Sequence, residues 1–152
     1  MTASKERLRL WLRLLKVVRG IEGELRENLR RDHNTTLPRF DVMSALSRHP
    51  DGLKMSKLSG VLRVSNGNVT GIADRLSEEG LVERVAVPGD RRATVLRLTS
   101  EGQREFARQA AEHERWVDEI LSGVSAADAR DIAARLNAIA AEAEEKETAD
   151  AQ

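Results

Sequence analysis

The chain has 152 residues, of which 40% are hydrophobic, 33% are charged and only 3% are aromatic. This composition predicts a helical protein with an aliphatic core and disfavours a β-sandwich or barrel, whose strands are rich in β-branched and aromatic residues. The absence of cysteine excludes disulfides, thiolate catalysis, thiol redox sensing and cysteine-bound zinc. No apolar run reaches the roughly 18 residues that span a bilayer, and the charged start MTASKERLRL does not fit a signal peptide, so we expect a soluble, cytoplasmic protein.

The formal net charge is zero, but the charges are unevenly distributed along the chain. Residues 1–37 carry a net charge of +4, residues 38–99 a net +3 and residues 100–152 a net −7. A basic first two-thirds permits a surface that faces DNA. Solvated helices also vary this much in charge, so this asymmetry alone decides little.

Helical periodicity dominates the first part of the chain. Apolar residues at spacings of three and four predict a helix over residues 5–31. They form two rows, namely Leu8, Leu12, Leu15, Val18, Leu25 and Leu29, and Leu10, Leu14, Val17 and Ile21. A helix with two apolar rows is expected to be covered from more than one side. A second helix is expected to begin near Pro38 and to stop before the turn at residues 49–52.

The middle of the chain predicts two short helices followed by a hairpin. A short extended piece at residues 53–54 precedes a helix over residues 55–62, and a three-residue break ends at Ser65, which is expected to cap a helix over residues 66–79. Residues 81–87 and 93–98 are short and β-branched, so they predict an antiparallel hairpin whose tip is residues 88–92.

Two further helices are expected after the hairpin. Thr99 is expected to cap a helix to about Ser122, and Ser125 with Asp128 to cap the last helix. The tail at residues 144–152 is expected to be frayed. The predicted fold is therefore mainly α with a small β-hairpin. A helix pair with a short turn is a common packing unit, but the hairpin directly after it indicates a winged helix-turn-helix, flanked by N- and C-terminal dimerisation helices.

Three motifs carry a resemblance to a known family. They are DRLSEEGLVER at residues 74–84, the triplet Asp90-Arg91-Arg92, and the segment Leu98-Thr99-Ser100-Glu101-Gly102. In order and spacing they resemble the MarR family of bacterial transcription regulators, and the flanking helices also match. The resemblance implies a winged helix-turn-helix DNA-binding domain at residues 38–99, a dimerisation region at residues 1–37 with 100–152, and a homodimeric, ligand-responsive repressor that binds a pseudo-palindromic operator in double-stranded DNA.

The helix that starts at Asn66 is the expected reading element. Its DNA-facing residues are predicted to be Ser65, Asn66, Gly67, Asn68, Thr70 and Gly71, while Val69, Ile72, Ala73 and Leu76 form its core face. Asparagine can bind adenine with two hydrogen bonds, and a helix N-terminus suits phosphate. Alternatively, Ser65 only caps the helix and the asparagines are solvated. Two glycines inside a helix cost roughly 1 kcal/mol each relative to alanine, which favours a functional use.

Arginines are the expected phosphate contacts. Arg75 is expected to bind phosphate, unless it pairs with Asp74 or Glu79 on the surface. Arg91 and Arg92 are expected to project at the hairpin tip, where the alternative is a solvated loop. The resemblance implies that Asp90 braces one arginine and that one arginine enters the minor groove, but it does not say which arginine does which.

The resemblance also implies a small aromatic acid as effector, bound between the dimerisation helices and the winged-helix lobe. The candidate pocket residues are Arg9, Trp11, Arg13, Lys16, Arg39 and Phe40, with cations for a carboxylate and rings for an aromatic group. The alternative is a solvated helix face. Residues 10–43 also resemble members that respond to hydroxycinnamate-type or benzoate-type acids or their coenzyme A thioesters, whose phosphates would suit Arg26, Arg30 and Arg31. Without cysteine, oxidant sensing is not expected.

No other set of residues indicates chemistry. The three histidines, His33, His49 and His113, lack metal-ligand spacing, and His113 is expected to be solvated. Trp11 and Trp116 lie in the expected dimerisation helices and are expected to anchor the interface between chains rather than to stack on bases. No nucleophile and base, phosphate loop or carboxylate pair indicates an enzyme, so we expect neither catalysis nor a cofactor. Two alternatives remain: a winged-helix module that binds protein, and a MarR-like regulator without a small-molecule effector. Salt-sensitive binding to promoter DNA separates the first from a regulator.

Overall fold

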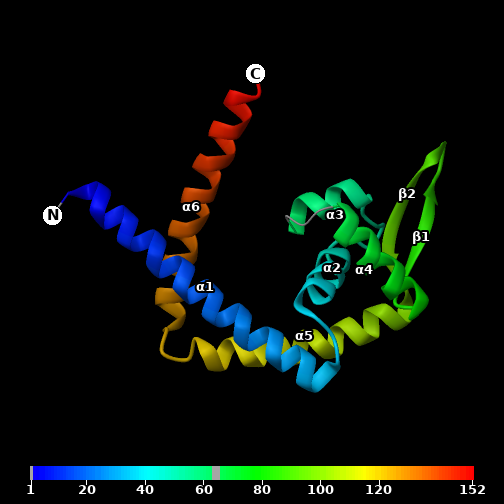
Figure 1. Cartoon of the computed structure of the whole chain (residues 1–152), viewed down its shortest axis with the longest axis horizontal. Coiled ribbons are helices and arrows are strands. Elements are labelled where there is room, and N and C mark those ends of the chain that lie inside the picture. The colour runs from blue at the N-terminus through cyan, green and yellow to red at the C-terminus, as the bar shows by residue number, and fades with distance from the viewer. Residues whose placement is uncertain (1, 63–65) are drawn as a thin grey trace. The chain divides into compact units, whose positions relative to one another are not determined.

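The computed structural model describes residues 2–62 and 66–152, with the side chains of residues 61, 62, 66, 67 and 91 outside the description. The elements follow in the order α1 (Ala3–His33), α2 (Leu37–Ser47), α3 (Met55–Leu62), α4 (Asn66–Glu78), β1 (Val82–Val87), β2 (Asp90–Leu98), α5 (Ser100–Ile120) and α6 (Ala126–Asp150) (Figure 1). They form two units, one up to residue 117 and one over residues 118–152. The expected mainly helical fold with one hairpin is confirmed.

One aliphatic core joins α2, α3, α4 and the hairpin. Its buried members are Val42, Met43, Ala45, Leu46, Leu58, Val69, Ala73, Leu76, Val82, Leu96 and Leu98. The backbone of Leu53 pairs with that of Leu96 through hydrogen bonds of 2.8 and 2.9 Å. This bridge confirms the expected extended piece and ties the start of α3 to the hairpin.

The hairpin is antiparallel, with Val82 opposite Leu98 and a register shift between Ala86 and Val87. β2 already begins at Asp90, so the expectation that residues 88–92 all form the tip is wrong. At this shift β2 has more residues than the β1 segment opposite it. Gly89 makes the turn between the strands with a positive φ of 83°. The triplet Asp90-Arg91-Arg92 therefore lies on strand rather than in a loop.

Local side-chain caps explain several helix boundaries. The Thr99 hydroxyl accepts a 3.0 Å hydrogen bond from the Gly102 amide, and the Ser125 hydroxyl accepts one of 3.1 Å from the Asp128 amide, as the sequence predicts. Thr36 caps α2 in the same way through the Arg39 amide, a cap that the sequence analysis missed. The tail expected to fray is helical to Asp150, because its alanines, glutamates and lysine favour helix.

The end of α1 lies beside α5. The Nε2 atom of His33 lies 2.7 Å from Oε2 of Glu112, and the His33 ring meets the Trp116 ring edge-on at 6.0 Å. Trp116 is only 3% exposed, so it anchors a contact within the chain. The expectation that Trp116 anchors an interface between chains is therefore corrected, whereas Trp11 is 56% exposed. None of the described helices has an apolar stretch long enough to cross a membrane.

Candidate nucleic-acid interface

The two faces of α4 differ as the sequence predicts. Val69, Ala73 and Leu76 are fully buried in the core. Asn68, Thr70, Gly71 and Arg75 are exposed on the rest of the helix. Asn66 is the first residue of α4, and Ser65 lies outside the described residues. The buried face fixes the rotation of α4, so the polar face is held toward solvent.

Gly71 is not required by the packing of this chain. A Cβ atom built on Gly71 would have no neighbour within 4 Å, so alanine would fit there and would favour the helix. A glycine that no internal contact demands is consistent with the close approach of an external partner. The surroundings of Gly67 lie outside the described part of the chain.

Arg75 has the freedom that a phosphate contact needs. The two carboxylates that could have paired with it are engaged elsewhere, since Asp74 accepts a 2.6 Å hydrogen bond from Arg84 and Glu79 pairs with Arg39. Among the described residues, Arg75 has no ion pair. The surface-pair alternative for Arg75 is therefore wrong in this structure.

A shallow hollow of about 300 Å³ brings several predicted residues together. Asn68, Gly71 and Arg75 of α4 line it with Thr36 and Arg39 at the start of α2. Polar and cationic groups thus border a surface where the backbone of α4 is bare. Such a surface can donate hydrogen bonds to base edges and to phosphate oxygens.

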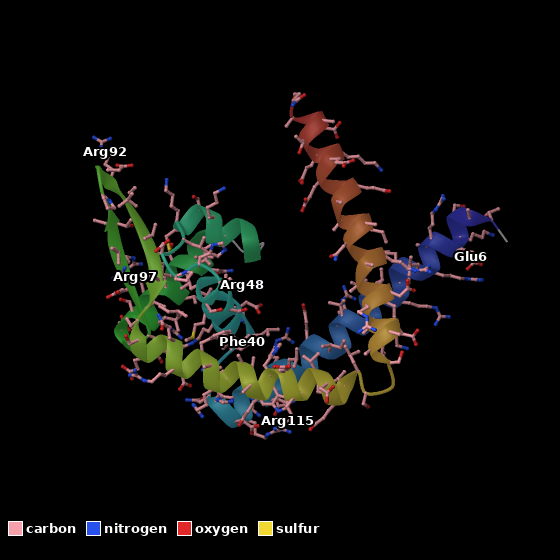
Figure 2. The ribbon with its side chains drawn as sticks, turned by 180° about the vertical axis from the view of Figure 1, so that it is seen from behind. Glu6, Phe40, Arg48, Arg92, Arg97 and Arg115 are labelled. Atoms are coloured by element: carbon pink, nitrogen blue, oxygen red, sulfur yellow. The ribbon has the colours of Figure 1, made fainter. Side chains whose placement is uncertain are left out.

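The hairpin presents a second cationic element. Figure 2 shows Arg92 near the end of the hairpin, and its side chain is exposed. The Oδ1 atom of Asp90 accepts a 3.1 Å hydrogen bond from the Arg92 backbone amide. Asp90 therefore holds the backbone at Arg92, and this bond does not involve the Arg92 guanidinium. Arg91 lies on β2 between them, with its side chain outside the description.

The candidate effector residues fall into two groups that one chain does not bring together. Arg9, Trp11, Arg13 and Lys16 are exposed in the first half of α1, where Arg9 pairs with Glu6 at 3.2 Å. The helix rises about 25 Å from Lys16 to the end of α1. The other two candidate residues, Arg39 and Phe40, lie beyond that end.

Those other two candidates are already engaged. Arg39 is ion-paired with Glu79, and the ring of Phe40 is 5% exposed. Phe40 stacks on His113 with ring centroids 4.5 Å apart and approaches Phe106 at 5.4 Å. The expectation that His113 is solvated is wrong, and its burial lowers the pKa of His113 below 6.5. Sequence reasoning missed this pairing because the two residues are 73 positions apart in the chain.

Known proteins match both the sequence and the fold. The model of the MarR family matches residues 35–94. The HTH-type transcriptional repressor MdtR of Bacillus subtilis is 32% identical over 78% of this chain and 68% of its own length. Alignments with three further curated regulators, 31% to 33% identical, span 53% to 63% of those proteins' length.

Solved structures of related proteins have the same fold as this chain. A MarR family transcriptional regulator from Silicibacter pomeroyi is 34% identical and superposes with a TM-score of 0.77, over 93% of this chain and 98% of that one. A mutant MarR from E. coli complexed with operator DNA is 22% identical, with a TM-score of 0.75 over 91% of this chain and 99% of that one, and supports the shared fold. Within the residues that the structure describes, no group of three or more metal-binding side chains occurs.

Proposed function

The chain belongs to the MarR family of transcriptional regulators, and we propose that it is a homodimeric repressor that binds a pseudo-palindromic DNA operator through α4 and the hairpin. The polar face of α4 carries this proposal. It is held outward by a fully buried opposite face, and it combines Asn68, Thr70, Gly71 and Arg75. Arg75 has no ion pair within the described part of the chain. The helix N-terminus adds backbone donors for phosphate.

The hairpin would place a second cation on the DNA. Arg92 is exposed near its end, and Asp90 fixes the backbone there. In this arrangement α4 enters the major groove, Asn66 and Asn68 contact base edges, and Arg75, Arg91 and Arg92 contact the backbone or the adjacent minor groove. Ser65 and Gly67 would let the start of the helix approach the DNA.

A second copy of the chain is the proposed partner for the apolar surface of the terminal helices. Large apolar side chains are at least 38% exposed at Leu8, Leu10, Trp11, Leu12, Val17, Val18, Leu121, Val124, Ile132, Leu136 and Ile139. A monomer rarely exposes so many, so residues 1–37 and 100–152 are proposed to form the dimer. Two α4 helices would then reach half-sites about 34 to 36 Å apart.

The experiment that tests this function is a fluorescence anisotropy titration of the chain with promoter DNA from upstream of its own gene. Specific binding with Kd on the order of 10⁻⁸ M or tighter is expected, falling steeply with salt. Light scattering at micromolar protein is expected to show a dimer. A protein that binds promoter and random DNA equally, or binds neither, would contradict the proposal; the second result would favour a winged-helix module for a protein partner.

We propose further that an aryl carboxylate or its coenzyme A thioester releases the operator. Its support is the cationic, exposed start of α1, where Arg9, Arg13 and Lys16 flank Trp11. Within one chain these residues lie far from Arg39 and Phe40. A pocket that uses both groups would therefore need α1 of the second copy. A panel of aryl acids and thioesters is expected to dissociate the protein–DNA complex, and Arg13→Ala is expected to weaken the response. Peroxide is expected to have no effect, and a panel without any active acid would refute this effector class.

A further inference from the structure

Arg39, at the start of α2, lies beside the side of α4 that is proposed to face DNA. It lines the shallow hollow of about 300 Å³ together with Asn68, Gly71 and Arg75 of α4. These three residues follow one another at spacings of three and four, so they form one row along the helix. The next position of this row is Glu79, one residue past the end of α4.

Glu79 neutralises Arg39. Its carboxylate forms an ion pair with the guanidinium of Arg39, whose side chain is only 17% exposed. The other cation within reach of the row is Arg75, but an arginine four positions before a glutamate is the less favourable order on a helix. A partly covered guanidinium is also screened less by water than an exposed one. Both effects favour the pair with Arg39.

The position of Arg39 is fixed by its neighbours on α2. The Thr36 hydroxyl accepts a 3.3 Å hydrogen bond from the Arg39 amide, and the next side chain, Phe40, is buried against His113. These contacts set the rotation of the first turn of α2, so the Arg39 side chain stays at the edge of α4. Glu79, rather than a movement of the helix, then determines whether the Arg39 guanidinium can meet an anion.

The ion pair halves the cationic charge of the hollow. Arg39 and Arg75 are the charged residues that line it, and Glu79 balances the first of them. Without the Glu79 carboxylate, two uncompensated guanidiniums would line the same hollow. A guanidinium binds phosphate oxygens through paired hydrogen bonds, so a DNA phosphate at the hollow would then meet two such groups. Glu79 therefore competes with phosphate for Arg39.

We propose that Glu79 limits the affinity of this chain for DNA by holding the Arg39 guanidinium away from the phosphate backbone. This role rests on the DNA binding proposed above for α4. A phosphate contact carries no sequence information and strengthens binding to every DNA, so one contact fewer makes binding weaker and less dependent on salt. Glu79 thus sets affinity, whereas Asn68 is proposed to set sequence preference.

Fluorescence anisotropy titrations of the full chain with promoter DNA and with random DNA test this role. Glu79→Gln keeps a hydrogen-bond acceptor for Arg39 but removes the negative charge. It is expected to bind both DNAs roughly fivefold more tightly at about 0.15 M salt and to steepen the slope of log Kd against log salt by about 0.9, the effect of one added phosphate contact. Glu78→Gln, the same change at the exposed neighbouring position, is the matched control and is expected to leave the slope unchanged.

The double variant Arg39→Gln/Glu79→Gln separates the release of Arg39 from the mere loss of a negative charge near DNA. It lacks both members of the ion pair, so it is expected to bind DNA with the affinity and salt dependence of the wild type. A gain in affinity that persists in the double variant, an equal gain in Glu78→Gln, or no gain in Glu79→Gln would overturn the proposal.

Glu79→Ala gives a second variant in case Glu79→Gln fails to fold, because the Glu79 side chain is half exposed and alanine favours a helix. It is expected to show the same gain and the same change of slope. If the wild type binds its promoter but neither Glu79 variant binds more tightly, this role of Glu79 is refuted while the proposed function stands. If neither the wild type nor the variants bind any DNA, both are refuted.

Discussion

The Asp74 carboxylate on α4 accepts a 2.6 Å hydrogen bond from the Arg84 guanidinium on β1. This contact joins the helix that carries Asn68 to the hairpin that carries Arg92. It also occupies the carboxylate nearest to Arg75 in sequence. The two elements proposed to touch DNA are therefore linked directly by one ion pair as well as through the shared core.

Separating Asp74 from Arg84 is expected to cost little stability. Both side chains are about half exposed, at 53% and 40%, so water and salt screen the pair. In a cycle of Asp74→Ala, Arg84→Ala and the double variant, urea unfolding is expected to give a coupling free energy of about 0.2 to 1 kcal/mol. The coupling should vanish at about 1 M salt. Zero coupling at low salt, or an undiminished value at high salt, would contradict this reading of the contact.

Gly102 is expected to tolerate no side chain. A Cβ atom at this position would lie 1.9 Å from the backbone carbonyl oxygen of Leu81, and that backbone cannot turn aside as a flexible side chain could. Gly102→Ala is therefore expected to lower the free energy of unfolding by about 1 to 3 kcal/mol or more.

The matched control for Gly102→Ala is Gly60→Ala in α3. A Cβ atom on Gly60 would have nothing within 4 Å, so alanine is expected to leave stability unchanged or raise it by about 0.5 to 1 kcal/mol. Thermal unfolding followed by circular dichroism measures both variants. Equal melting temperatures for the two would show that the approach of Leu81 does not constrain residue 102.

Local patterns predicted the elements well because their causes are local. The three- and four-residue spacing of Val69, Ala73 and Leu76 fixes the buried face of α4, and the hydroxyls of Thr99 and Ser125 satisfy amides three residues away. These features need no knowledge of distant segments.

Contacts between distant segments could not be predicted from one sequence. His33 meets Glu112 across 79 positions, and Arg39 meets Glu79 across 40. Nothing in the spacing of these residues distinguishes partners from solvated surface groups. For the same reason His113 was predicted to be solvated and Trp116 to anchor a dimer interface, whereas both pack within the chain.

The hairpin and α4 are expected to contribute to DNA binding in different ways. Arg92→Ala should weaken binding to every sequence and reduce the slope of log Kd against log salt by about one, because one phosphate contact is lost. Arg91→Ala is expected to behave similarly. Arg135→Ala, which removes an exposed arginine of α6, is the control and should leave the slope unchanged.

Asn68→Ala is expected instead to relax sequence preference, with about 1 to 3 kcal/mol lost at one base pair. Anisotropy titrations with an operator and with single-base variants of it measure this difference. A uniform loss across all the variants, like that expected for Arg92→Ala, would assign Asn68 to phosphate contact and remove it from base readout.

Stability is expected to fall at mildly acidic pH because of His113. Burial against Phe40 lowers its pKa below the ordinary 6.5, so the unfolded chain binds this proton more tightly than the folded chain. The contribution of neutral His113 is fully present above about pH 6.5 and is lost as pH falls through the lower pKa of the folded state.

His113→Phe keeps a ring against Phe40 but cannot take up a proton. In urea unfolding at about pH 8 and pH 5, the wild type should lose more stability than His113→Phe, while the exposed-site control His49→Gln should behave as the wild type does. The Glu112–His33 contact is present in all three proteins, so its contribution cancels in the comparison. An equal loss in wild type and His113→Phe would show that His113 does not govern the acid response.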